Sequence, residues 1–285
     1  MKRFPIRSVA GSLMAVMCLL GNGGTPAQAD VMLGINFNAY PDRRGATVAP
    51  AETAGAVTQQ NWNNAMLPGP TPATDATDDG AGHVSFSNST SGISLIDSNG
   101  AAYPAITYSI TGGYPGGNAS APWSAWGVAS ISGGTAGDRH LMQGGLQTRN
   151  NLGTIVLNSV HAFTGSVSYD LYVYYTPRDG TSTVNLLNTL NVYQDNNPVA
   201  FGTYTITSIP FTGNGYVQSN GSGGTGNYLK ITGLTADTLK LTDLGQDWTN
   251  SVAGIQIVPI PEPATLGLLA IPGVGGLMMR SRRHK

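Results

Sequence analysis

Hydrophobic and polar residues alternate along the middle of the chain, most clearly from Val167 to Tyr175. Asp170, Tyr172 and Tyr174 occupy the even positions of this run. Side chains point alternately to the two faces of a strand, so a period of two predicts a strand with one buried face and one wetter face. The predicted buried face consists of the odd positions, Val167, Tyr169, Leu171, Val173 and Tyr175.

Shorter runs of β-branched and aromatic residues predict further strands. They cover Val31–Phe37, Val84–Phe86, Ile93–Ile96, Gly153–Leu157, Val184–Val192, Val199–Ile206, Tyr228–Thr232, Thr238–Leu244 and Ile255–Val258. No stretch has a convincing amphipathic helical pattern, and only the Ala-rich Pro50–Asn64 favours a helical turn. The predicted fold class is therefore all-β, an antiparallel β-sandwich or jelly roll.

Three stretches rich in Gly, Pro, Ser and Asn predict long surface loops, at Pro68–Gly82, Gly112–Gly137 and Thr212–Gly226. Long loops on a rigid β frame often carry binding residues, but low-complexity spacers have the same composition.

The first 29 residues have the three parts of a secretory signal peptide. Lys2, Arg3 and Arg7 precede the apolar run Val9–Leu20, which predicts a short signal helix. Ala27 and Ala29 form an A-x-A site for signal peptidase, with cleavage expected before Asp30. The alternative, a lasting membrane anchor, needs roughly 20 apolar residues. Cleavage removes Cys18, the one cysteine of the chain.

The other end has three parts in order. Pro259–Thr265 is rich in proline, Leu266–Met279 is apolar but interrupted by Gly and Pro, and Arg280–Lys285 is basic. As a helix the apolar part covers only about 20 Å at 1.5 Å per residue, short of the ~30 Å hydrocarbon core. It therefore predicts a short hydrophobic helix that holds the chain in the inner membrane transiently, with a permanent tail anchor as the alternative.

This arrangement resembles the PEP-CTERM sorting signal. The resemblance implies that an exosortase-type membrane enzyme recognises Pro261, Glu262 and Pro263, removes the tail, and delivers the protein to the cell surface or the extracellular space of a bacterium that makes extracellular polysaccharide. The domain division expected is 1–29 signal peptide, 30–258 β-sandwich and 259–285 sorting signal.

Short motifs of the body also resemble exported β-sandwich proteins that carry such tails. They are Ile35–Phe37, Ala54–Val57 with Asn61–Asn64, Tyr169–Tyr174 and Gly254–Val258, in that order. The Tyr-rich strand is similar to that of galactose-binding-like jelly rolls. The resemblance implies a fold but supplies no substrate, because those exported proteins mostly have no assigned activity.

Charge narrows the classes of partner. Residues 30–260 hold seven basic and fourteen acidic residues, a net charge of −7, although the whole chain carries −1. An acidic domain with no basic cluster is not expected to bind nucleic acid. The negative charge favours solubility instead.

Catalytic patterns are weak. Glycoside hydrolysis needs two neighbouring carboxylates, but Glu52 is the one Glu of the body and reads as a solvated turn residue. His83, His140 and His161 are far apart in sequence and no Gly-x-Ser-x-Gly motif is present, so a serine hydrolase is not supported. Asp138–His140 resembles a reactive cluster, but we interpret it as a loop ion pair before a strand starting at Leu141.

Metal patterns are weak too, and no cofactor is expected. Zinc is not expected, because no pair of His or Cys has ligand spacing. A structural calcium ion remains open, because acidic turns occur at Asp97–Gly100 and around Asp75, Asp78 and Asp79. Ordinary turns have the same composition.

Trp123 and Trp126 are the candidate ligand-binding residues, because two indoles in a Gly-rich loop can stack on sugar rings. The interpretation that we favour is that both close one end of the sandwich, because burial of large apolar groups is favourable. Trp62 and Trp248 are interpreted as packing residues. The function expected is a non-catalytic structural or adhesive component of extracellular polysaccharide. The alternatives are a carbohydrate-binding module and, third, a secreted glycan-active hydrolase.

Overall fold

A computed structural model describes residues 31–37, 47–65, 77–78, 83–87, 94–113, 123–124, 131–143, 145–147, 153–165, 167–177, 187–244 and 250–261. The chain separates into two compact units, Met1–Asp30 and Val31–Lys285, and all described residues belong to the second. The predicted signal helix and C-terminal hydrophobic helix lie outside the described residues. Within these residues, no helix has the length and apolar character that crossing a membrane requires.

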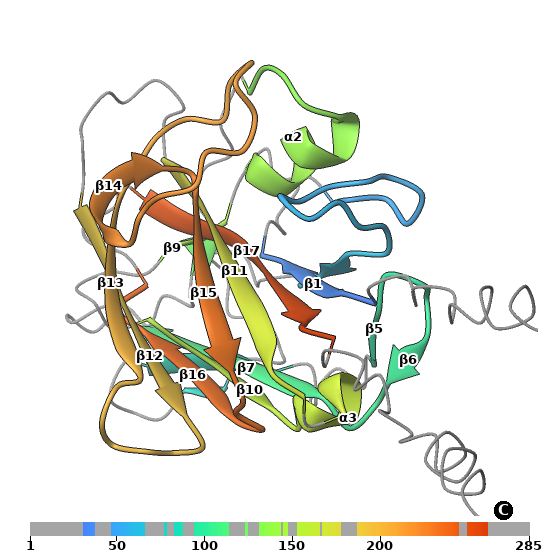
Figure 1. The fold of residues 1–285 in the computed structure, drawn as a ribbon, viewed down its shortest axis with the longest axis vertical. Helices are drawn as coiled ribbons and strands as arrows, with labels where there is room; N and C mark the ends of the chain where they lie inside the picture. Colours follow the sequence, from blue (N-terminus) through green and yellow to red (C-terminus); the bar gives the residue numbers. More distant parts are fainter. Residues whose placement is uncertain are drawn as a thin grey trace, which may run out of the picture. The chain divides into compact units, whose positions relative to one another are not determined.

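Two large sheets dominate this unit (Figure 1). The first, the seven-stranded sheet, has the order β15 (Tyr228–Leu234), β11 (Tyr169–Pro177), β17 (Asn250–Pro259), β1 (Leu33–Asn36) and β2 (Asn63–Asn64). The short β9 (Leu146–Gln147) pairs with β17 and with β8 (Trp123–Ser124).

The second, the eight-stranded sheet, has the order β14 (Ser222–Gly226), β13 (Gly202–Ser208), β12 (Leu187–Gln194), β16 (Leu239–Thr242), β10 (Thr154–Asn158), β7 (Thr107–Gly113), β4 (His83–Ser87) and β3 (Thr77–Asp78). A separate hairpin joins β5 (Leu95–Ile96) to β6 (Ala102–Tyr103). The described helices are short, α2 (Ala136–Met142) and α3 (His161–Thr164). The all-β prediction is confirmed.

The main core lies where the two sheets face each other. Ile255 and Leu171 of the seven-stranded sheet share one buried cluster with Ile155, Leu190 and Leu241 of the eight-stranded sheet. In β10 of the eight-stranded sheet the pattern is strictly alternating, because Thr154, Val156 and Asn158 are half-buried while the residues between them are fully buried. This is the period of two expected for a sheet with one face on the core.

A second buried cluster covers the opposite face of the seven-stranded sheet. There Tyr172 and Tyr174 of β11 pack with Trp62, Leu141 and Phe211. The segment 47–62, helix α2 and residues 209–219 supply the covering side chains. Every residue of β11 is consequently buried. The prediction of a wetter face at Asp170, Tyr172 and Tyr174 is wrong, because these three segments pack over the two tyrosines and Lys230 pairs with Asp170.

Three other local predictions need correction. Residues 50–62 form turns and a β-bridge between Ala54 and Gln59 rather than a helical turn. Leu141 belongs to α2, not to a strand, because Thr135 and Asp138 form a capping box that starts a helix. The predicted loop at 212–226 ends in the strand β14, which pairs in parallel with β13.

The longest strand that the sequence analysis does not predict is β7, although its signal is present. Ile106, Tyr108 and Ile110 alternate with polar residues, and β7 carries the last two of them into the main core. The Ala, Tyr, Pro and Gly residues on either side conceal this alternation in the sequence.

Candidate functional site

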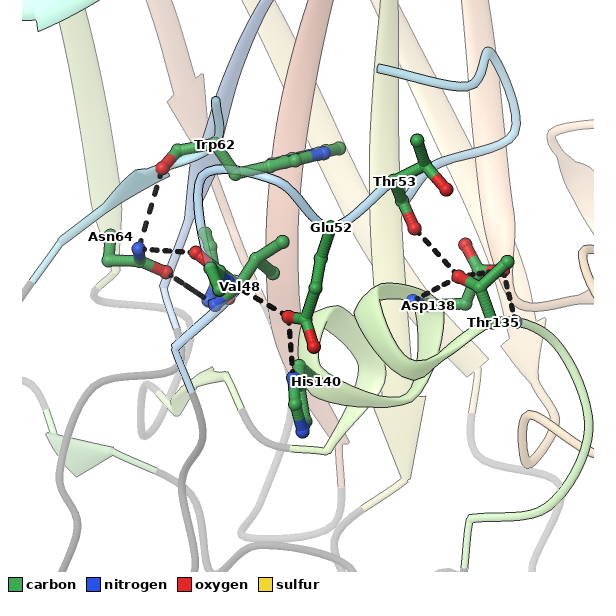
Figure 2. A network of polar contacts seen from close by, with 10 residues as sticks. Val48, Glu52, Thr53, Trp62, Asn64, Thr135, Asp138 and His140 are labelled. Carbon is green, nitrogen blue, oxygen red and sulfur yellow. Dashed lines mark hydrogen bonds and ion pairs between the residues drawn. The ribbon is translucent and has the colours of Figure 1, made fainter. Parts of the chain in front are cut away.

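Polar side chains concentrate where the segment 47–65 meets α2 above the seven-stranded sheet (Figure 2). The segment reaches this position because β2 at its end pairs with β1, while Trp62 packs edge-on against Tyr174 of β11 at 5.9 Å. Asn64 holds the start of the segment, donating to the Val48 carbonyl and accepting from the Val48 N–H, both at 2.9 Å. Residues from distant parts of the chain therefore meet on one face.

Glu52 and His140 form the one contact here with the chemistry of an acid–base pair. His140 Nδ1 lies 2.8 Å from Glu52 Oε2, which also accepts the Ala49 N–H at 2.9 Å. Partial burial alone raises the pKa of Glu52, but the Ala49 N–H, His140 and nearby Arg139 together hold it below its usual value. Glu52 is therefore a bridging carboxylate and not the solvated turn acid that the sequence suggests.

Asp138 is fully occupied as an acceptor. Its Oδ2 accepts from the N–H and the hydroxyl of Thr135, both at 2.9 Å. Its Oδ1 accepts from the Gly55 N–H at 3.1 Å and the Tyr216 hydroxyl at 2.9 Å. The carboxylate caps α2 and ties it to two segments far away in sequence. The predicted loop ion pair within 138–140 is wrong, because Arg139 donates instead to the carbonyls of Gly133 and Gly134.

A buried chain of hydrogen bonds continues beneath. Tyr174 donates to Gln256 Oε1 at 2.6 Å and accepts the Ala56 N–H at 2.9 Å. The Gln256 amide donates to the Val57 carbonyl at 2.6 Å and to Gln59 Oε1 at 2.8 Å. Burial raises the pKa of the hydroxyls of Tyr174 and Tyr216 well above the usual value. Both remain protonated donors over the working pH range.

This network holds covering segments in place and has the features of a structural clamp. Glycosidase chemistry needs one carboxylic acid with a raised pKa, whereas Glu52 is shifted the other way and Asp138 is saturated with donors. The close fit supports the same interpretation. A Cβ on Gly137 of α2 would overlap the Thr53 carbonyl oxygen. We therefore assign the Glu52–His140 pair to attachment of α2.

A second polar group lies at the edge of the same sheet and was not foreseen. Lys230 of β15 is 2.8 Å from Asp170 Oδ2, and its ammonium lies 5.4 Å from the centre of the Tyr172 ring. The hydrogen bond to Asp170 raises the pKa of Lys230, and burial opposes this rise. Tyr172 stacks on Tyr228 at 6.0 Å. These four side chains form two pairs on neighbouring strands, and the members of each pair lie two residues apart. The sequence alone could not group them, because their grouping depends on the register between the strands.

The acidic turn at Asp97 is explained without an ion. Asp97 is buried, and its Oδ1 accepts the N–H groups of Asn99 and Ala101 at 2.8 and 2.9 Å. Its Oδ2 accepts the Tyr103 hydroxyl at 3.1 Å. The carboxylate thus closes the β5–β6 hairpin. Among the described residues, no cluster of three His, Cys, Asp or Glu side chains could hold a metal. Asp75 and Asp79 lie outside them.

Few of the sequence-predicted site residues fall within the described part. Pro261 does, and it is exposed two residues after the end of β17. Ala27, Ala29, Glu262, Pro263 and Trp126 lie outside, as does Trp248. Trp123 belongs to β8 opposite Gln147, and only its backbone is described. Trp62 is buried, which confirms its interpretation as a packing residue.

No family model matches the chain, and no curated protein matches it.

Proposed function

We propose that this protein is an exported, non-catalytic β-sandwich, sorted through its C-terminal segment to the cell surface or extracellular matrix, where it associates with polysaccharide. Signal peptidase acts at Ala29, and an exosortase-type enzyme acts at Pro261, Glu262 and Pro263. One observation carries the proposal: the described strands nearest the two processing motifs, β1 and β17, begin and end within a few residues of them.

The pairing of the strands shows where these two ends of the body lie. Leu33 pairs with Ile257 in the first register position of β1 and β17, so the two ends of the body leave side by side from the middle of the seven-stranded sheet. At the C-terminal side Tyr169 pairs with Pro259, and the Ile260 N–H donates to the Ser168 carbonyl at 2.7 Å. Exposed Pro261 follows at once. Cleavage at both motifs would therefore leave the sheets and their core intact.

We infer that the carboxylates of the body do not act on a substrate, because donors of the protein itself already engage them. Glu52, Asp138 and Asp97 each accept at least two hydrogen bonds from the protein itself. Groups engaged in this way stabilise the fold and are poor acids or bases for a bound substrate.

We further propose the jelly-roll class for the sandwich. Along the chain β10, β12 and β16 belong to one sheet, and the intervening β11 and β15 belong to the other. Such repeated crossing between sheets is typical of double-sheet jelly rolls.

The mass of the intact protein, recovered separately from cells and from medium, tests the sorting proposal. A chain running from Asp30 to the Pro261–Glu262–Pro263 region supports it. A chain retaining Arg280–Lys285 in all fractions contradicts it and indicates a lasting anchor. The variant Glu262→Gln should accumulate the unprocessed mass in the membrane fraction, whereas Glu52→Gln, which changes the same residue type inside the body, should be processed normally.

A further inference from the structure

The outer face of the eight-stranded sheet carries an unusual set of side chains. On β7, β10, β16, β12 and β13 the residues between the buried positions are half-buried or exposed. Hydroxyl and amide residues predominate among them, namely Thr107, Ser109, Thr111, Thr154, Asn158, Thr242, Thr189, Asn191, Thr203, Thr205 and Thr207. We call this surface the hydroxyl face. Its five strands lie next to one another in the sheet (Figure 1).

The strand register aligns part of this face in a single row. Thr111 pairs with Thr154, Thr154 with Thr242, Thr242 with Asn191, and Asn191 with Thr203. Five neighbouring strands thus each contribute one short polar side chain at the same level. At a strand spacing of about 4.8 Å, the row is about 19 Å long.

Hydrogen bonds along the face order some of these groups and leave others free. Thr203 donates to Asn191 Oδ1 at 2.6 Å. Asp243 Oδ2 accepts from both Asn191 and Thr242, which ties two strands together. The side-chain hydroxyls of Thr154, Thr189 and Thr205 have no partner among the described residues. A hydroxyl can donate one hydrogen bond and accept two, so these three groups can engage a ligand in either sense.

The charge of the hydroxyl face indicates which kind of ligand it can bind. Lys240 is the only charged side chain on the outward positions of these five strands, and it lies 5.5 Å from the centre of the Tyr193 ring. Asp243, at the end of β16, is engaged by Asn191 and Thr242. A polyanion needs several cations and a cation needs free carboxylates, and this face offers neither. Uncharged groups that both donate and accept are complementary to the hydroxyls of a neutral sugar.

Apolar surface borders the row. Phe201, which directly precedes β13 and lies two positions from Thr203, is 46% exposed. Leu187, which is 48% exposed, lies farther along the same face, opposite Thr207. Aromatic rings next to hydrogen-bonding groups suit the C–H faces of sugars. Neighbouring strands are also rotated by roughly 20° relative to each other, so a row over five strands follows a twisted path. A flexible chain can follow this path, whereas a rigid flat lattice cannot.

We propose that the hydroxyl face binds a single chain of neutral polysaccharide. This inference rests on the proposed function, because it identifies the surface through which the exported body meets its matrix.

The test is affinity electrophoresis and titration calorimetry of the full-length chain with hydroxyethyl cellulose, galactomannan and dextran. The polyanion alginate is the comparison polymer. The variant Thr154→Val/Thr189→Val/Thr205→Val removes three hydroxyls and keeps the shape and the β-branching of the side chains. Thr232→Val on β15 makes the same change at an exposed strand position of the other sheet and serves as the matched control.

We expect retardation by at least one neutral polymer and none by alginate. The triple variant should bind at least about tenfold more weakly, equivalent to about 1.4 kcal/mol, while Thr232→Val binds like the parent. The proposal is overturned by equal binding of the triple variant, by preference for alginate, by no binding to any neutral polymer, or by a loss that follows Trp123→Ala and Trp126→Ala instead. Because purified chain is used, each of these results is independent of the mass measurement that tests sorting.

Discussion

Tyr174 of β11 donates a 2.6 Å hydrogen bond to Gln256 of β17, and both side chains are fully buried on the face of the sheet opposite the main core. The same hydroxyl accepts the Ala56 N–H, and the Gln256 amide reaches the Val57 carbonyl. A pair of polar side chains on neighbouring strands thus fixes the covering segment 47–62. Buried polar groups of this kind stabilise only while every partner is present.

Removing the Tyr174 hydroxyl therefore has a clear expected effect. Tyr174→Phe leaves Gln256 Oε1 and the Ala56 N–H short of a partner in a buried site, and it should lower the free energy of unfolding by about 1–3 kcal/mol. Urea denaturation followed by tryptophan fluorescence measures the loss. Tyr228→Phe is the control, because that hydroxyl bonds Gln218 in an exposed position. Equal stability of the two variants would show that the buried chain of hydrogen bonds is unimportant.

The Glu52–His140 contact predicts a pH dependence. The pKa of Glu52 is lower in the folded state than its unfolded value of 4.5. A carboxyl group shifted downward stabilises the fold above the unfolded pKa, and this contribution disappears as the pH falls through the folded-state pKa. The stability difference between the parent and Glu52→Gln should thus be larger at pH 6 than at pH 3. Denaturation curves of both proteins at the two pH values measure it. A stability difference that is constant with pH would contradict an ionic contribution of Glu52 to stability.

The contact of α2 with the segment 47–65 predicts that replacing a helical glycine by alanine destabilises the protein, which is the opposite of the usual effect. Ala is favoured over Gly inside a helix by up to about 1 kcal/mol. A Cβ at Gly137, however, would overlap the Thr53 carbonyl oxygen and crowd Glu52. Overpacking of this kind typically destabilises by about 1–3 kcal/mol. Gly137→Ala should therefore lower the melting temperature, and Gly213→Ala, where a Cβ meets nothing within 4 Å, should not. A stabilised Gly137→Ala variant would mean that α2 is not seated in this way.

A substitution in the hairpin turn at Asp97 distinguishes a structural carboxylate from a calcium ligand. Asp97→Ala removes the acceptor of two N–H groups and of the Tyr103 hydroxyl, so it should destabilise by about 1–3 kcal/mol. Because these donors are protein groups, the loss should be the same in EDTA and in millimolar calcium. Differential scanning calorimetry in both buffers measures it. If calcium stabilises the parent but not the variant, Asp97 is an ion ligand after all.

The sequence by itself determined most of the longer strands. The alternation from Val167 to Tyr175 predicted β11, and similar runs predicted β1, β10, β15 and β17 within a few residues. The period of two needs no partner to be recognised, because it follows from the geometry of one extended chain. The same alternation occurs at β7, where the turn-forming residues on either side conceal it.

Only the tertiary structure decided what covers each face. The sequence predicts a wetter face of β11 at Asp170, Tyr172 and Tyr174. All three are nevertheless buried, because segments more than 30 residues away fold over the two tyrosines and Lys230 pairs with Asp170. Glu52 and His140 are 88 positions apart, and nothing local to either residue indicates the other. The row from Thr111 to Thr203 likewise exists only through the pairing of five strands. Local periodicity sets the strands, but long-range pairing and burial determine which side chains meet, since they depend on the whole chain at once.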